Sequence, residues 1–250
     1  FGPGTVVDVG SSSRWLAAAA MMTLVDQGLL HLDDPVSMYL PEFTGPKAAI
    51  TIRQLWSYSS GLPASDPSLT DRAITLEECV KRIAENPLVD EPGAVVHEGF
   101  ASIQVGARVC EAISGMTWQE FFRTHLAEPL GMTSTSFNLM GFNRNPFVAG
   151  GARSTAADYA RFLSMLLQDG LWQGKRILSA EAVAELERDQ APNAAVASTP
   201  YTTTATLLPS TSGARPGLGM WREQTDSHTG ALLIGACPGT YGFTPWIDTT

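Results

Sequence analysis

The fold of this chain is decided by the stretch Val6-Val7-Asp8-Val9-Gly10-Ser11-Ser12-Ser13-Arg14-Trp15-Leu16-Ala17. Its β-branched start predicts a strand, its glycine a turn, and the apolar run after the serines a helix. A serine in the first turn of a helix lies near free backbone N–H groups, which favour negative charge. Residues three apart share a helix face, so Ser11 and Arg14 are expected on the same side. Either Ser12 or Ser13 simply caps the helix, or a serine of this run carries out chemistry.

The composition is that of a folded protein with an acidic surface. Of the 250 residues, 44% are hydrophobic and 16% are charged, which favours a sizeable buried core over disorder. The formal net charge is −9 and no basic stripe interrupts it, which argues against nucleic acid or an anionic membrane surface as a partner. No apolar run approaches the ~20 residues that a transmembrane helix needs.

The cysteines and histidines form no pattern that predicts a metal site. Cys79, Cys110 and Cys237 are widely spaced and match neither a zinc motif nor a CxxC motif. The four histidines are scattered along the chain. We therefore expect no metal and no cofactor.

The order of the expected elements is a strand, then many helices, then strands. Residues 189–215, rich in Ala, Thr, Ser and Pro, are expected to form a long surface loop. This order favours an α+β fold in which one antiparallel sheet collects both chain ends around an inserted helical region. Helices are expected at 13–29, 75–85, 101–114 and 117–127, with others capped by Thr51, Thr155 and Ser179, and strands at Leu218–Arg222, Ala231–Ala236 and Tyr241–Ile247.

An ordered set of short motifs covers nearly the whole chain and resembles one known family. The chain is similar to the serine β-lactamase and penicillin-binding-protein superfamily, in the class C-like branch that contains esterases and DD-peptidase relatives. The motifs are Gly10–Arg14, Leu24–Leu29, Leu32–Val36, Tyr39–Phe43, Thr51–Leu55, Ser59–Pro63, Pro92-Gly93, Glu128–Met132 and Gly150–Asp158.

The resemblance implies an architecture and an activity. It implies one domain over 1–250, with a helical lobe at about 59–150, an α/β part at 1–58 and 151–250, and the active site between them. It implies a serine hydrolase that attacks a small-molecule ester, β-lactam or D-amino-acid amide through an acyl-enzyme on Ser11. The chain begins at Phe1 and resembles a fragment whose sheet is incomplete at both ends. The cellular compartment of the protein is therefore not predicted from this sequence.

Two residues depart from the motifs of the family. The first motif is normally Ser-x-x-Lys, whereas here Arg14 follows Ser11, and an arginine stays charged and cannot act as a general base. The second motif normally carries a tyrosine, and Glu98 stands at that position. A salt bridge between Arg14 and Glu98 is therefore expected. The adjacent His97 is a lesser candidate for a base, because alternation along a strand points it away from the side of Glu98.

The third motif, which lies on a strand edge and helps to form the oxyanion hole, has two possible locations. The segment His228-Thr229-Gly230 has the better residue types. The segment Cys237-Pro238-Gly239-Thr240 has the better distance to the last strand, so we assign the third motif to Cys237 and Gly239 and keep His228 as a lesser candidate.

Two functions remain open from the sequence. The retained framework favours a serine hydrolase. The paired changes at Arg14 and Glu98 favour a catalytically impaired relative that binds a ligand or partner in the cleft.

Overall fold

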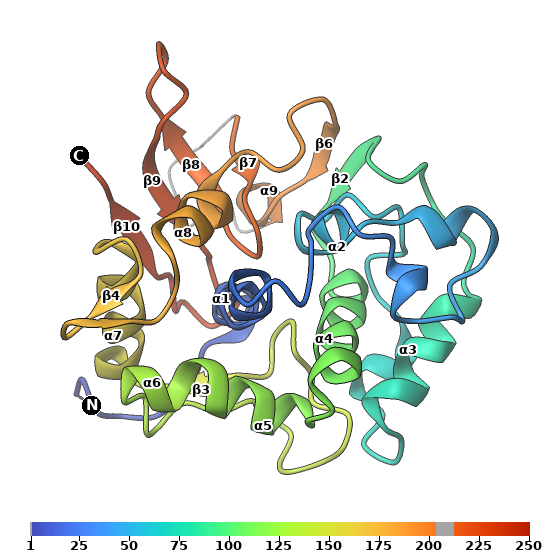
Figure 1. Ribbon diagram of the computed structural model, residues 1–250, viewed down its shortest axis with the longest axis horizontal. Helices are drawn as coiled ribbons and strands as arrows, with labels where there is room; N and C mark the ends of the chain where they lie inside the picture. Colours follow the sequence, from blue (N-terminus) through green and yellow to red (C-terminus); the bar gives the residue numbers. More distant parts are fainter. Residues whose placement is uncertain (1, 204–212) are drawn as a thin grey trace.

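The computed structural model describes residues 2–203 and 213–250. Helix α1 (Ser13–Asp26) lies at the centre of the molecule, directly after the short 3-10 helix η1 (Gly10–Ser12). In Figure 1 the strands β7 to β10 lie on one side of α1, and the helices α3 and α4 lie on the other. The α+β fold class predicted from the sequence is confirmed.

The other described helices begin and end close to the expected positions. Thr51, Thr75 and Thr117 each form a capping box at the start of a helix, and Thr155 and Ser179 each accept a hydrogen bond from a first-turn amide. These helices are α2 (Ile52–Trp56), α3 (Leu76–Glu85), α4 (Ala101–Ser114), α5 (Trp118–Phe122), the π-helical turn η5 (Arg123–Ala127), α6 (Glu128–Leu130), α7 (Ala156–Leu166), α8 (Ala180–Glu187) and α9 (Pro200–Thr203), with 3-10 turns η2 (Val36–Met38), η3 (Gly45–Ala49) and η4 (Pro67–Thr70).

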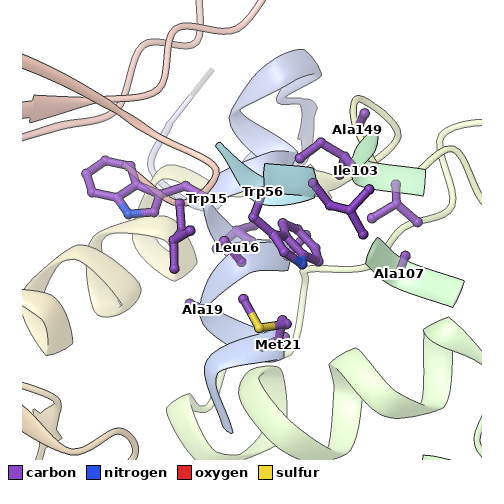
Figure 2. Close-up of a cluster of buried hydrophobic side chains, with 14 of the residues drawn as sticks. Trp15, Leu16, Ala19, Met21, Trp56, Ile103, Ala107 and Ala149 are labelled. Atoms are coloured by element: carbon purple, nitrogen blue, oxygen red, sulfur yellow. The ribbon is translucent and has the colours of Figure 1, made fainter. Parts of the chain in front are cut away.

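Helix α1 is buried on every side. All residues from Ser13 to Leu24 are buried, and α1 packs against α4, α8 and η5. Figure 2 shows Leu16 of α1 close to Trp56 of α2. A Cβ atom on Gly106 of α4 would lie only 2.7 Å from the Trp56 indole, so the glycine allows α2 and α4 to approach. This core fixes the position of the residues at the start of α1.

The strands form four separate small sheets among the described residues. An antiparallel sheet has the order β10-β9-β8-β7, β1 pairs antiparallel with β3, β2 pairs parallel with β6, and β4 pairs with β5. Their bounds are β1 (Val7–Asp8), β2 (Val95–His97), β3 (Arg153–Ser154), β4 (Leu171–Trp172), β5 (Lys175–Arg176), β6 (Ala195–Ser198), β7 (Arg215–Pro216), β8 (Trp221–Thr225), β9 (Leu232–Ala236) and β10 (Trp246–Asp248).

The expectation that one sheet collects both chain ends is wrong for these strands. Strand β1 pairs with β3, where Val7 lies opposite Ser154 and Asp8 forms an ion pair of 2.9 Å with Arg153. The amide of Val9 then donates to the carbonyl of Ala152, so the chain turns into η1 directly beside β3. These contacts hold the first strand away from the four-stranded sheet.

The expected loop at 189–215 is also corrected where it is described. Strand β6 and helix α9 lie within it, whereas 204–212 fall outside the described residues. Near the end of the chain, the strand expected at Tyr241–Ile247 begins only at Trp246, because a turn with Gly242 at φ 80° comes first. None of the described helices is long and apolar enough to cross a membrane.

Candidate active site

Ser11 is the one serine of the Ser11–Ser13 run whose side chain lines a cavity. The Ser12 hydroxyl donates to the carbonyl of Cys237 at 2.6 Å, and the Ser13 hydroxyl donates to the carbonyl of Gly10 at 2.6 Å. Neither hydroxyl caps α1, so the capping interpretation of this run is wrong. The hydroxyls of Ser12 and Ser13 therefore face backbone carbonyls, and neither residue lines the cavity.

Arg14 connects Ser11 to Glu98. Its Nη2 donates to the Ser11 hydroxyl oxygen at 3.0 Å, and its Nη1 donates to Glu98 Oε1 at 2.6 Å. Its Nε donates to the carbonyl of Ala149 at 3.3 Å. The side chains of Arg14 and Glu98 are 2% and 15% exposed, so this is a buried, charge-assisted pair. The salt bridge predicted from the sequence is confirmed.

Two aromatic rings enclose the same guanidinium. The Arg14 Cζ atom lies 5.5 Å from the ring centroid of Tyr58 and 5.0 Å from that of Phe100, within the range of cation–π contacts. Burial opposes the charge, but the neighbouring Tyr58 and Glu98 outweigh it, and the pKa of Arg14 is raised above its ordinary value. The guanidinium is therefore a fixed cation beside Ser11.

Tyr58 and Phe100 were missed by the sequence reasoning. Tyr58 is held by an unusual backbone conformation, with φ at 61°, and its ring stacks on that of Trp221 at 5.4 Å between centroids. One signal that could have found such residues is Arg14 itself, because a permanently charged side chain in an apolar helix needs partners on each of its faces.

Strand β2 positions Glu98 immediately after its last residue. The His97 amide donates to the carbonyl of Tyr58 at 2.9 Å, and the Glu98 amide donates to the Ser198 hydroxyl of β6 at 3.0 Å. The imidazole Nε2 of His97 lies 2.7 Å from Asp90 Oδ2. His97 does not line the cavity, so this lesser candidate is corrected: it faces Asp90 rather than Ser11.

The two locations considered for the third motif lie in different places. His228 lies in the exposed turn between β8 and β9, where Asp226 accepts its backbone amide, and it does not line the cavity. In the segment that begins at Cys237, Gly239 and Thr240 line the cavity together with Ser11. His228 is therefore corrected as a site candidate.

The amide groups expected to form the oxyanion hole are engaged elsewhere. The Cys237 amide donates to the carbonyl of Pro245 at 3.1 Å, and the Gly239 amide donates to the carbonyl of Phe243 at 2.8 Å. This corrects Cys237 and Gly239 as donors, because the turn before β10 uses both N–H groups. Gly239 has a steric role, since a Cβ atom there would lie 2.2 Å from the carbonyl oxygen of Val9.

The cavity collects residues from segments that are far apart in the sequence. Its volume is about 260 Å³. Among the described residues, no group of three or more His, Cys, Asp or Glu side chains could hold a metal ion. The lining residues are Ser11, Arg14, Glu98, Phe100, Pro200, Pro238, Gly239 and Thr240.

The family of the chain follows from comparison with known proteins. A family model described as Beta-lactamase matches residues 1–249. The chain belongs to the β-lactamase family. Members of the family with solved structures are hydrolases related to β-lactamases and penicillin-binding proteins.

Several relatives of the family resemble the chain in sequence or in fold. A solved structure of a Bacteroides dorei DSM 17855 protein, described as a putative beta-lactamase, is 35% identical, with a TM-score of 0.89 over 100% of this chain and 76% of the other. The solved structure of EstCE1, described as a hydrolase with promiscuous acyltransferase activity, is 23% identical, with a TM-score of 0.76 over 100% of this chain and 78% of the other, and supports the fold alone.

A curated relative is longer than this chain. "Putative penicillin-binding protein PbpX" of Bacillus subtilis (strain 168) is 30% identical over 172 residues, which are 67% of this chain and 43% of the relative. The chain therefore spans less than half of that protein.

Proposed function

We propose that the chain is a serine hydrolase that forms an acyl-enzyme on Ser11 with an ester, a β-lactam or a D-amino-acid amide. The observation that carries this proposal is the hydrogen-bonded series from Ser11 through Arg14 to Glu98 at a cavity. We further propose a helical lobe at 59–150 that contributes Glu98 and an α/β part that contributes Ser11.

The roles of the residues follow from their protonation chemistry. Arg14 stays charged, so it cannot accept the proton of Ser11. It donates a hydrogen bond to the hydroxyl oxygen, which leaves the Ser11 proton for another acceptor and stabilises negative charge on that oxygen. Glu98, at the other end of the guanidinium, is the carboxylate proposed to receive this proton, directly or through water.

The proposed acylation conserves atoms and charge. The Ser11 oxygen bonds to the substrate carbonyl carbon while its proton passes to Glu98, and the proton then goes to the departing alkoxide or amine. Water cleaves the acyl-enzyme by the reverse transfer. The amide groups of Ser11 and Thr240 are proposed as oxyanion donors, since both residues line the cavity and the Gly239 amide is engaged.

A second function is ligand binding without turnover. It is favoured by one observation, namely that Glu98 is already paired with Arg14 at 2.6 Å. In this pairing the carboxylate is engaged by Arg14 and not by the Ser11 hydroxyl.

Covalent labelling tests the proposal. The protein is treated with a fluorophosphonate and, separately, with nitrocefin and p-nitrophenyl acetate, and the modified residue is located by mass spectrometry. We expect labelling on Ser11 that is abolished in Ser11→Ala and unchanged in Ser164→Ala. Labelling on Ser12 or Ser13 alone would end the assignment of Ser11 as the nucleophile. Acylation of Ser11 that is not followed by hydrolysis of the acyl-enzyme would favour the second function.

A further inference from the structure

A second cavity adjoins the proposed site. Its volume is about 440 Å³, and Phe100 lines both this cavity and the one that contains Ser11. The volume is within the usual range of small-molecule sites, which is roughly 300–1,000 Å³. The lining residues are Ser65, Asp66, Pro67, Leu69, Thr70, Phe100 and Phe147.

The walls of this cavity are apolar and aromatic. The rings of Phe100 and Phe147 meet edge to face, with 5.4 Å between their centroids. Leu69 and Pro67 complete the apolar lining. An edge-to-face pair of this kind leaves ring surface for a further aromatic group.

A buried polar network holds two of the walls together. Gln104, on α4, donates through Nε2 to Asn145 Oδ1 at 3.1 Å and accepts at Oε1 from the Val148 amide at 3.0 Å. These two hydrogen bonds hold the chain before and after Phe147. Asn145 Nδ2 in turn donates to the carbonyl of Ser68 at 2.8 Å, within the segment that forms the opposite wall. Gln104 and Asn145 are 0% and 2% exposed, so the network is shielded from water.

Phe100 is fixed against the same segment. Its amide donates to the carbonyl of Ala64 at 2.6 Å. Gly99 makes this approach possible, because a Cβ atom there would lie 2.7 Å from the Ala64 Cα atom. The cavity is thus preformed by contacts that do not depend on a ligand.

The polar wall carries a negative charge. Asp66 Oδ1 accepts from the amide and the hydroxyl of Ser68, and Asp66 Oδ2 accepts from Asn86 Nδ2 at 2.7 Å. Although burial opposes ionisation, these hydrogen bonds lower the pKa of Asp66. No ion pair with Asp66 is found among residues 2–203 and 213–250, and the nearby charge of Arg82, which is paired with Asp71, also lowers its pKa. Asp66 thus places a carboxylate that is hydrogen-bonded only to neutral donors in the cavity wall.

We propose that this second cavity binds an aromatic group, neutral or amine-bearing, and that Asp66 excludes groups that carry a carboxylate. Its link to Ser11 rests on the proposed function: the group bound here is the side group of the substrate whose carbonyl reaches Ser11, because Phe100 lines both cavities.

Binding of three probes of similar size tests the cavity without any need for turnover. Phenylacetamide, phenethylamine and phenylacetate are titrated into the protein and followed by ligand-observed NMR. We expect the amide and the amine to bind at least tenfold more tightly than the anion, the size of discrimination that one nearby partly screened charge supplies. In Asp66→Asn the anion should come within about threefold of the amide, whereas Asp169→Asn, the same charge change outside the cavity, should leave the order unchanged.

A filled cavity locates the binding. Thr70 is exposed and lines the cavity, so Thr70→Trp fills the space without disturbing the core. This variant should lose binding of the amide and the amine by tenfold or more. Unchanged binding in Thr70→Trp, or equal binding of all three probes to the parent, would overturn the proposal.

Acylation provides the link to Ser11. In the parent, p-nitrophenyl phenylacetate should acylate Ser11 faster than p-nitrophenyl acetate, and Thr70→Trp should bring the ratio of the two rates close to one. If neither ester acylates Ser11, the proposed function fails while the probe titrations still decide the subsite. If the esters react without preference, the side-group role fails and the proposed function stands.

Discussion

Removal of the Glu98 carboxylate should destabilise the protein, because it leaves a buried cation without its anionic partner. In Glu98→Ala the guanidinium of Arg14, whose side chain is 2% exposed, keeps its hydrogen bonds to Ser11 and to the carbonyl of Ala149. It loses the Nη1 contact of 2.6 Å. The two flanking rings hold the guanidinium in place, so it cannot swing out to water.

The size of the effect follows from the burial of the pair. Breaking a buried ion pair by removing one partner costs about 3–5 kcal/mol. Because Glu98 is 15% exposed and Arg14 keeps other partners, we expect the lower end, about 3 kcal/mol. For a chain of this size that lowers Tm by roughly 6–12 °C.

Urea and thermal unfolding measure this loss directly. The matched control is Glu128→Ala, which removes the partner of Arg123 from a pair whose side chains are both 57% exposed. Exposed pairs contribute about 0–1 kcal/mol, so the control should unfold almost like the parent. Glu98→Gln, which keeps an acceptor oxygen but not the charge, should fall between. If Glu98→Ala were as stable as Glu128→Ala, the buried pair would contribute no more to stability than an exposed one, which would contradict this prediction.

Three further predictions concern the site and the pH dependence of stability. Arg14→Lys and Glu98→Tyr restore the residues usual in the family, and each alone should raise the rate of Ser11 acylation only slightly. The double variant should raise that rate by ~10-fold or more beyond the product of the two single gains. A double-variant rate with p-nitrophenyl acetate that equals this product would contradict the prediction. Gly239→Ala should lose about 1–3 kcal/mol of stability and most Ser11 labelling, because its Cβ atom would overlap a backbone carbonyl. Labelling of Ser11 at the parent rate would argue against this close packing of Gly239 beside the site. Burial raises the pKa of Glu187 from an ordinary 4.5 to about 7, so the folded state binds more protons than the unfolded state between these values and stability falls as pH rises through that window. Glu187→Gln should therefore be more stable than the parent by roughly 1–2 kcal/mol at pH 8 and equal to it near pH 4. The exposed control is Glu181→Gln, and a stability difference between Glu187→Gln and the parent that does not change with pH would exclude the raised pKa of Glu187.

Features decided by nearby residues were predictable from the sequence. A threonine followed three residues later by Gln or Glu marks the starts of α2, α3 and α5, and the structure has a capping box at each. The contact between Ser11 and Arg14 is also local, since it spans one helical turn. The pair of Arg14 with Glu98 was predicted only because the resemblance to the family aligned two distant positions.

Features decided by distant pairing were not predictable. Strand β2 and strand β6 are short and pair in parallel across about a hundred residues, and neither carries an alternating apolar pattern strong enough to indicate a partner. The Cys237 and Gly239 amides were expected to face the cleft, but the turn before β10 supplies acceptors for both. No local motif indicates that Tyr58 adopts a positive φ and lies against Arg14.

The surroundings of Arg14 bear on whether this site has simply lost a lysine. A pocket shaped for a compact ammonium would leave part of a guanidinium unpaired, and each unpaired buried N–H group costs about 1–3 kcal/mol. Here the Nε, Nη1 and Nη2 atoms each donate to a separate acceptor, and aromatic rings lie within cation–π range. The acceptors and rings come from η1, the segment after β2, the start of α4, the loop after α2 and the loop before β3, so the match involves much of the fold. A planar, permanent cation is thus part of the architecture of the site, and in the proposed reaction proton transfer falls to Glu98 while position 14 holds the nucleophile and its charge.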